Sequence, residues 1–168
     1  MYQNKDHTNQ KHIVTKSSNI DISNQKILLE IAKKISNLIK QGDNLLLFGE
    51  IGVGKTTFTR ILINQLQNKN KLETTEVLSP TFNILNEYQI NNLMIKHYDF
   101  YRIKQYEELK NLGLFEEKDA INIIEWPELI KLNNIKYTSL NFSYSDGFKN
   151  RNLIISSNYP NKIIDEFK

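Results

Sequence analysis

The sequence predicts an α/β fold, in which a largely buried β-sheet is flanked by helices. Leu45–Phe48 is a continuous apolar run of strand length bounded by turn-forming residues, and Ala120–Ile124 is a second such run. Continuous apolar runs are typical of strands buried on both faces of a parallel sheet. A glycine-rich loop follows the first run and leads into a segment with helical spacing. The order helix, buried strand, glycine-rich loop, helix therefore favours an α/β domain.

A helix is expected before the first buried strand, because apolar residues recur there at helical spacing. These residues are Ile27, Leu28, Ile31, Ile35, Leu38 and Ile39. Asp21 or Ser23 is expected to cap its N-terminus, and the turn-forming residues Gln41–Asn44 end it. Thr56–Leu66, directly after the glycine-rich loop, is expected to form the next helix.

Two hairpins are predicted in the second half of the chain. Ile84–Gln89 and Leu93–Phe100 resemble two strands, with Asn91-Asn92 as the turn because asparagine tolerates positive φ. Ile135–Tyr144 and Asn152–Ser156 are expected to pair around Asp146-Gly147. Between the hairpins, Tyr106–Leu112 has helical spacing, and Gly113 is a typical helix stop.

The length of 168 residues suits one domain, and we see no internal repeat. We expect residues 19–158 to form it. Residues 1–18 are expected to be a disordered extension or an edge strand at Ile13-Val14, and residues 159–168 a loose tail. His7 and His12 lie in the extension, where the ordinary interpretation is a pair of solvent-exposed side chains rather than metal ligands.

The glycine-rich loop Gly49-Glu50-Ile51-Gly52-Val53-Gly54-Lys55-Thr56 fits the phosphate-binding pattern G-x-x-x-x-G-K-[ST]. Glycines let backbone N–H groups converge on phosphate oxygens, and the following helix N-terminus adds oriented donors. In this pattern the lysine reaches the β- and γ-phosphates, and the threonine hydroxyl binds Mg²⁺. The sequence therefore predicts ATP and Mg²⁺ as cofactors. The residues expected to bind the nucleotide are Glu50, Ile51, Gly52, Val53, Gly54, Lys55, Thr56 and Thr57.

An acidic residue is also expected near Mg²⁺, at the end of a neighbouring strand. Glu125 directly follows a buried strand, and Asp99 lies near the end of Leu93–Phe100, on the same strand face as His97. The structural alternatives are a solvated loop acid for Glu125, an ion-pair partner of Arg102 for Asp99, and a histidine hydrogen-bonded within the sheet for His97. We predict Lys55, Asp99 and Glu125 as catalytic residues, and Thr56 and Glu125 as the metal-binding pair.

Composition narrows the class of protein further. The chain has no cysteine, which excludes disulfides and thiolate sites, and its net charge of +3 is only mildly basic. We see no clustered basic stripe with interleaved aromatic residues, so direct nucleic-acid binding is not favoured. No apolar run reaches the ~18 residues of a membrane-spanning helix, and no secretory signal is evident. A cytoplasmic protein is the default expectation.

Four segments together resemble the TsaE (YjeE) family. They are GEIGVGKTTFTR, SPTFNILNEY, HYDFYR and IIEWPE, and their order and spacing match from about residue 22 to about residue 157. The resemblance implies a P-loop NTPase fold with a central mixed parallel/antiparallel β-sheet. It also implies an ATPase needed for threonylcarbamoyladenosine formation next to the anticodon of tRNAs that read ANN codons. The ATPase would depend on the TsaB–TsaD complex, with tRNA as an indirect partner.

The resemblance also assigns roles to individual residues. Lys55 and Thr56 correspond to the family's phosphate and magnesium residues, Glu125 to its magnesium-associated glutamate, and Asp99 to its required aspartate. Trp126 corresponds to the tryptophan after that glutamate, and Thr81 resembles a switch-like threonine. The N-terminal extension has no clear family counterpart. The C-terminal hairpin matches only loosely, through Asp146-Gly147 and Arg151, and Arg151 is either near the nucleotide or on an exposed strand.

Three other functions are possible for a chain with a phosphate-binding loop. A GTPase would normally carry N-K-x-D, and Asn161–Ile164 does not supply it. A small-molecule kinase commonly has an arginine-rich lid, whereas this chain has only Arg60, Arg102 and Arg151. An ATP-gated binding module with little chemistry of its own stays open, because a partner can supply an arginine finger.

Overall fold

The computed structural model describes residues 15–168, so the histidines and the edge strand considered for the first 14 residues lie outside the described part. The described residues form a sheet in the order β1-β8-β7-β3-β6-β5-β4, and β2 also pairs with β8. The strands are β1 (Thr15–Lys16), β2 (Ile20–Asp21), β3 (Asn44–Phe48), β4 (Leu85–Ile90), β5 (Leu93–Asp99), β6 (Ile121–Glu125), β7 (Thr138–Ser145) and β8 (Asn150–Ser157). The helices are α1 (Gln25–Leu38), α2 (Lys55–Lys69), α3 (Tyr106–Leu109) and α4 (Lys162–Glu166), with 3₁₀ turns η1 (Lys110–Leu112) and η2 (Pro127–Leu129).

The sheet is mixed, as predicted. β3 pairs in parallel with β6 on one side and with β7 on the other, and β5 pairs in parallel with β6. The two predicted hairpins, β4–β5 and β7–β8, supply the antiparallel pairs. The parallel strands therefore form the centre of the sheet, and their carboxyl ends lie along one edge.

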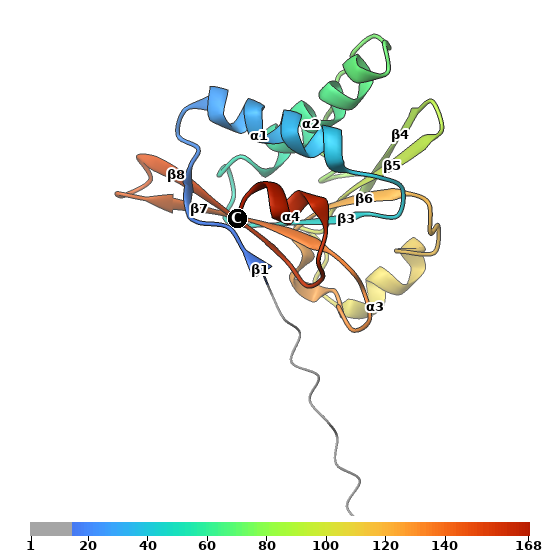
Figure 1. The fold of residues 1–168 in the computed structure, drawn as a ribbon. Coiled ribbons are helices and arrows are strands. Elements are labelled where there is room, and N and C mark those ends of the chain that lie inside the picture. Colours follow the sequence, from blue (N-terminus) through green and yellow to red (C-terminus); the bar gives the residue numbers. More distant parts are fainter. Residues whose placement is uncertain (1–14) are drawn as a thin grey trace, which may run out of the picture.

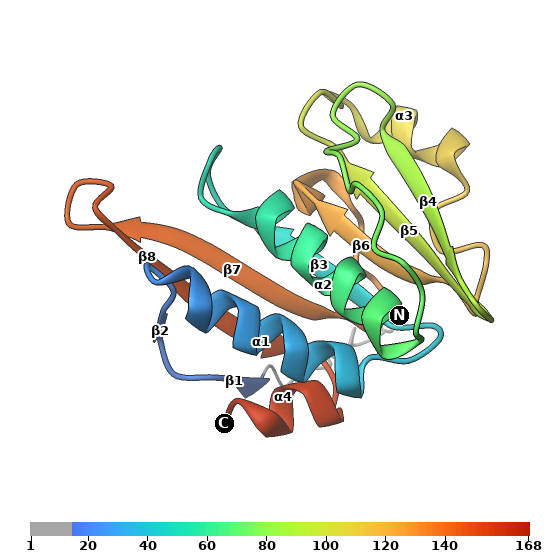
Figure 2. The ribbon, with the colours of Figure 1, turned by 90° about the horizontal axis from the view of Figure 1, so that it is seen from above.

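Helices cover both faces of this sheet. Leu45 and Leu47 of β3 pack in the core that includes α1, α2 and α4, whereas Leu46 between them packs in a second core with Leu109 of α3. In Figure 1, α1 and α2 lie above the sheet and α3 lies below it, and Figure 2 shows α1 and α2 running side by side over the strands. Successive side chains of a strand point to opposite faces, which explains why β3 is apolar at every central position.

The end of the chain differs from the expected loose tail. Residues 162–166 form α4, and Ile163 and Ile164 are buried in the larger core. The side chain of Asn161 accepts a hydrogen bond from the backbone N–H of Ile164 at 3.1 Å and so caps this helix. Burial of two isoleucines fixes a segment that is too short to give a periodic signal in the sequence.

The start of the described chain adds narrow edge strands. Thr15–Lys16 and Ile20–Asp21 both pair antiparallel with β8, so the sheet begins within the residues that were expected to precede the domain. Helix α1 is capped by Asn24, whose side chain accepts from the N–H of Lys26 at 3.0 Å, rather than by Asp21 or Ser23. Within residues 15–168 we find no helix with the length and apolar character of a membrane span.

Candidate nucleotide site

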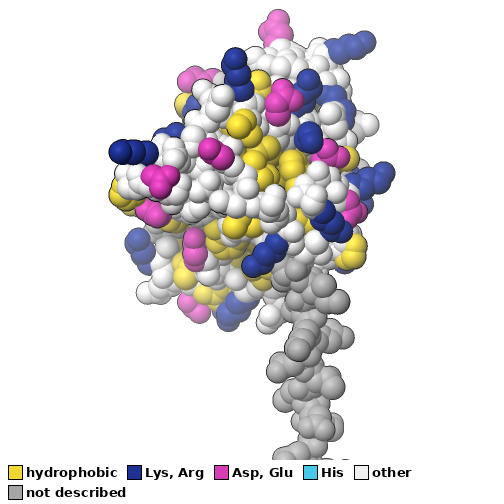
Figure 3. Space-filling view, turned by 60° about the vertical axis from the view of Figure 1, so that its left-hand side comes forward, with side chains coloured by type: hydrophobic (Ala, Val, Ile, Leu, Met, Phe, Trp, Pro, Cys, Tyr) yellow, Lys and Arg dark blue, Asp and Glu magenta, His cyan; other side chains and the backbone are white. Residues whose placement is uncertain are grey.

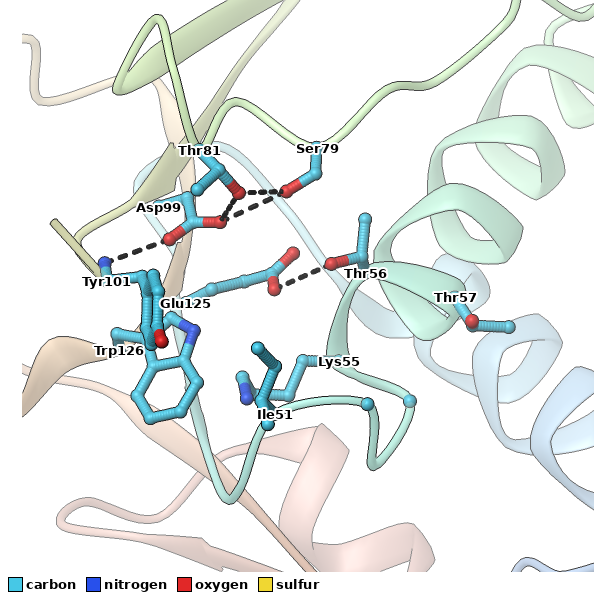
Figure 4. A pocket seen from close by; sticks show the side chains of 12 residues that line it. Ile51, Lys55, Thr56, Thr57, Ser79, Thr81, Asp99, Tyr101, Glu125 and Trp126 are labelled. Atoms are coloured by element: carbon cyan, nitrogen blue, oxygen red, sulfur yellow. Dashed lines mark hydrogen bonds between the residues drawn. The ribbon is translucent and has the colours of Figure 1, made fainter.

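The candidate site lies at the carboxyl ends of the central parallel strands. The glycine-rich loop follows β3, Asp99 ends β5, and Glu125 ends β6 as the register partner of Asp99. A cavity of ≈ 280 Å³ lies between these strand ends and the start of α2. The parallel pairing of β3, β5 and β6 is therefore what brings the predicted loop and both predicted acids into one place (Figure 4).

Two glycines of the loop are required for different reasons. Gly49 has φ 134°, and a Cβ there would lie 2.5 Å from the carbonyl oxygen of Phe142 on β7, so only glycine fits. Gly54 has φ 121°, a conformation that residues with a Cβ rarely adopt, and it lines the cavity with open space where a Cβ would lie. The chain thus leaves open space at the start of α2, where backbone N–H groups have no intrahelical partner. This arrangement fits a bound phosphate group.

Lys55 folds back over its own loop. Its Nζ donates to the carbonyl oxygens of Gly49 and Glu50 at 2.6 and 2.9 Å, and lies 3.8 Å from the ring centroid of Trp126. Burial lowers the pKa of the Lys55 ammonium, and the negative charges of Glu125, Glu128 and Asp99 oppose that shift. The ammonium is therefore a buried cation beside carboxylates, in a position to meet an anionic ligand.

Thr56 and Glu125 contact each other across the cavity. The hydroxyl of Thr56, on the first turn of α2, donates to Oε2 of Glu125 at 2.8 Å. The other oxygen of the same carboxylate, Oε1, lies 2.8 Å from Nε2 of His97. Glu125 is thus a buried, fully hydrogen-bonded carboxylate and not the solvated loop acid considered as the alternative.

Asp99 is held by the loop that contains Ser79-Pro80-Thr81-Phe82. Its Oδ2 accepts from the hydroxyls of Ser79 and Thr81 at 3.0 and 2.6 Å, and its Oδ1 accepts from the backbone N–H of Tyr101 at 2.9 Å. The guanidinium of Arg102 lies instead 4.0 Å from the ring of Phe82, so the structure does not support the Asp99–Arg102 pair. Asp99 therefore couples the end of β5 to this loop.

The predicted nucleotide-binding residues divide into two groups. Ile51, Gly52, Gly54, Lys55, Thr56 and Thr57 line the ≈ 280 Å³ cavity. Glu50 is exposed and Val53 is fully buried in the core, and neither of them lines that cavity.

Ser79 and Tyr101 also line the cavity, although the sequence did not single them out. Tyr101 continues the two-residue alternation of His97 and Asp99, and this period was the available signal. The ring of Tyr101 packs 5.0 Å from that of Trp126, which has φ 57° and turns the chain sharply after β6. Two aromatic rings thus border the site next to Lys55, as Figure 4 shows.

A second cavity, of ≈ 320 Å³, adjoins the same loop and shares Gly52, Gly54 and Thr57 with the first. Arg151 lies along it, with its guanidinium 5.7 Å from the ring centroid of Tyr144. The hydroxyl of Tyr144 in turn donates to the carbonyl oxygen of Ile51 at 3.4 Å. The loosely matching C-terminal hairpin therefore does reach the glycine-rich loop.

The oxygen groups at the site fit a magnesium ion bound together with a nucleotide. Among residues 15–168 no group of three or more His, Cys, Asp or Glu side chains is arranged to hold a metal by itself. Mg²⁺ in nucleotide sites usually has one or two protein ligands and completes its shell with phosphates and waters. The Thr56 hydroxyl and the Glu125 carboxylate form a donor set of that kind.

Comparison with known proteins identifies the family of this chain. The family model described as "Threonylcarbamoyl adenosine biosynthesis protein TsaE" matches residues 22–153. The chain is 37% identical over 149 residues to the tRNA threonylcarbamoyladenosine biosynthesis protein TsaE of Rickettsia felis, which covers 86% of this chain and 83% of that protein. It is 31% identical over 150 residues to the Haemophilus influenzae protein of the same name, covering 83% and 90%.

A solved structure shows the same fold. The crystal structure of YdiB from Bacillus subtilis superposes with a TM-score of 0.66 over 93% of this chain and 95% of that one, at 22% sequence identity. The mixed sheet, the glycine-rich loop at its carboxyl edge and the family match over residues 22–153 confirm the resemblance drawn from the sequence. The chain belongs to the TsaE family, the threonylcarbamoyladenosine biosynthesis proteins of tRNA modification.

Proposed function

We propose that this protein is a magnesium-dependent ATPase whose activity depends on the TsaB–TsaD complex. The observation that carries the proposal is the hydrogen bond between Thr56 and Glu125, which joins the end of the glycine-rich loop to the end of β6. A hydroxyl and a carboxylate in this relation are the protein ligands that a nucleotide-bound Mg²⁺ requires. The bound ion would neutralise charge on the phosphates as the terminal phosphoryl group is transferred to water.

The residues around this pair have distinct roles in the proposal. Lys55 carries the positive charge that binds phosphate oxygens, and the N-terminus of α2 supplies backbone donors. Asp99 accepts hydrogen bonds from two hydroxyls of the Ser79–Phe82 loop and so holds this loop at the edge of the cavity. The two aromatic rings, Tyr101 and Trp126, pack against each other and border the cavity next to Lys55.

Partner dependence is supported by the positions of the arginines. All three arginines of the chain fall within the described residues, and none of them lines the ≈ 280 Å³ cavity. Arg60 donates to the carbonyl oxygen of Val77, Arg102 lies over Phe82, and Arg151 lies along the second cavity. Phosphoryl transfer commonly gains a large factor from an arginine supplied in trans. We therefore propose that the partner complex completes the site.

Adenine is the proposed base. The second cavity begins at the same loop glycines, so a nucleotide with its phosphates at Lys55 has room for its base on that side. The chain lacks the N-K-x-D string that reads guanine. Competition binding should show that ATP displaces a labelled ATP analogue at lower concentration than GTP does, and equal or tighter GTP binding contradicts the assignment.

Contact with tRNA is proposed to be indirect, and the location cytoplasmic. On the face drawn in Figure 3, Lys and Arg side chains are interspersed with Asp and Glu, and hydrophobic side chains show between them. A surface that tracks a nucleic-acid backbone has its basic residues clustered instead. The modified tRNA is thus proposed to be handled by the partner complex.

The central experiment compares hydrolysis with and without the TsaB–TsaD complex. Glu125→Gln keeps the size of the side chain and removes its charge, so we expect hydrolysis with partner to fall by on the order of 100-fold or more. Glu107→Gln, an exposed change on α3, is the matched control and should hydrolyse ATP normally. Normal turnover by Glu125→Gln contradicts the assignment. A wild-type protein that binds ATP yet never hydrolyses it with partner present would support an ATP-gated binding module instead.

A further inference from the structure

A buried histidine lies directly behind the proposed magnesium residue. His97 on β5 is fully buried, and Glu125 at the end of the neighbouring strand β6 is 2% exposed. Nε2 of the imidazole lies 2.8 Å from Oε1 of the carboxylate. The second oxygen, Oε2, accepts from Thr56 at 2.8 Å. The Glu125 carboxylate is therefore held at both oxygens, by the core on one side and by the glycine-rich loop on the other.

The position of the proton on His97 follows from its surroundings. A carboxylate only accepts hydrogen bonds, so the ring nitrogen that faces it must carry a proton. Nδ1 has no hydrogen-bond partner among residues 15–168, and a buried side-chain N–H without a partner is rare in proteins. The proton that faces the carboxylate therefore lies on Nε2, and His97 donates one hydrogen bond, whose acceptor is Glu125.

His97 does not line the ≈ 280 Å³ cavity, so it has no direct access to a nucleotide or a metal ion there. Its effect on that site must pass through the carboxylate. Without contacts, the carboxylate of a glutamate rotates broadly about its terminal torsion, χ3. The bond from Nε2 restricts this torsion and keeps Oε2 directed at Thr56.

We infer that His97 is a positioning residue for magnesium binding: it orients the Glu125 carboxylate before nucleotide and metal arrive. This inference rests on the proposed function, since it assumes that Glu125 serves the metal. Groups that hold a metal-binding carboxylate are worth about 10–100-fold in metal affinity or activity. A purely structural histidine would change the stability of the sheet and leave the magnesium requirement as it is.

The test measures how binding of a non-hydrolysable ATP analogue depends on Mg²⁺ concentration, for the full chain alone. His97→Leu fills the space without a donor, and we expect it to raise the half-saturating Mg²⁺ concentration by about 10–100-fold. His97→Gln places an amide donor near the former Nε2 and should keep the wild-type requirement. Tyr98→Phe is the matched core control, because Tyr98 is also fully buried on β5 but packs in the other core.

The possible results distinguish the proposed magnesium site from the role of His97. If wild-type binding of the analogue needs no Mg²⁺, both the proposed magnesium site and the role of His97 are overturned. If the wild type requires Mg²⁺ and folded His97→Leu has the same half-saturating Mg²⁺ concentration, only the role of His97 is overturned. Should His97→Leu fail to show a cooperative thermal transition, His97→Asn replaces it, because its shorter amide does not reach Oε1. The inference is supported if the half-saturating Mg²⁺ concentration is raised for His97→Asn and unchanged for His97→Gln. Equal values for the two variants overturn it.

Discussion

The ammonium of Lys55 lies 3.8 Å from the ring centroid of Trp126, the only tryptophan in the sequence. The same nitrogen also donates to two carbonyl oxygens of its own loop. A cation over an indole ring is attracted to it by roughly 0.5–2 kcal/mol. To reach a phosphate the lysine has to give up part of this arrangement. Binding of a nucleotide therefore changes the contact between Lys55 and the ring of Trp126.

Tryptophan emission should therefore report nucleotide binding. We expect a saturable change in emission when Mg²⁺ and ATP are added, because the ammonium moves from the indole ring towards the phosphates. The measurement is a fluorescence titration, with Lys55→Met as the control, whose emission should differ from wild type before any ligand is added. An unchanged spectrum at nucleotide concentrations that saturate an independent binding assay contradicts this prediction.

Replacing Lys55 should separate binding from stability. Lys55→Ala is expected to weaken ATP binding on the order of 100-fold, since hydrogen bonds to a charged group are worth about 1.5–3 kcal/mol. Burial lowers the pKa of Lys55, which means that its ammonium is less favourable in the folded than in the unfolded protein. Lys55→Met, which keeps the apolar stem, should thus unfold at the same or a higher temperature than wild type. Calorimetry of the apo protein checks this, and a lost transition would assign Lys55 a structural role.

The Ser79–Phe82 loop should change with the state of the nucleotide. Ser79 and Thr81 both donate to Oδ2 of Asp99, and all three residues line the ≈ 280 Å³ cavity. Contacts available only with a γ-phosphate would order this loop, and hydrolysis would release it. With partner present, hydrogen exchange over residues 77–83 should be slower with a non-hydrolysable ATP analogue than with ADP. Identical protection in both states would make the loop a static turn.

Tyr159 should make the protein sensitive to alkaline pH. Its hydroxyl donates to Oδ1 of Asp43 at 3.2 Å, and burial, reinforced by the Asp43 charge, raises its pKa to about 12. A raised pKa stabilises the fold below the ordinary value of 10.0, and that contribution is lost as the pH rises towards about 12. Tyr159→Phe should be less stable at neutral pH by about 0.5–1.5 kcal/mol. Urea unfolding should show a weaker loss of stability for this variant between pH 10 and 12. Parallel pH profiles of the two proteins would contradict the assignment.

Local sequence patterns predicted the central strands, the two long helices, both hairpins and the phosphate loop, but they did not predict helix α4. The apolar run at β3 predicted a strand covered on both faces, and Leu45 and Leu46 indeed pack in different cores. The loop of Gly49–Thr56 needs glycine where the chain approaches Phe142 and where Gly54 adopts a φ of 121°. Patterns of this kind act over a few residues, and four of them in order identified the family.

Only the tertiary structure decided which distant groups meet. Thr56 and Glu125 are 69 residues apart and become neighbours because β6 pairs with β3, and no periodicity in the sequence encodes that order of strands. The sequence around Asp99 is compatible with an ion pair to Arg102 or with hydrogen bonds from hydroxyls. The path of the Ser79–Phe82 loop places the hydroxyls of Ser79 and Thr81 next to Asp99. Helix α4 is likewise stable where Ile163 and Ile164 find a core to cover. The sequence by itself determined the central strands, the two long helices and the chemistry of the loop, because those depend on neighbouring residues. The carboxylate geometry and the packed end of the chain depend on long-range burial, and that exists only once the sheet has assembled.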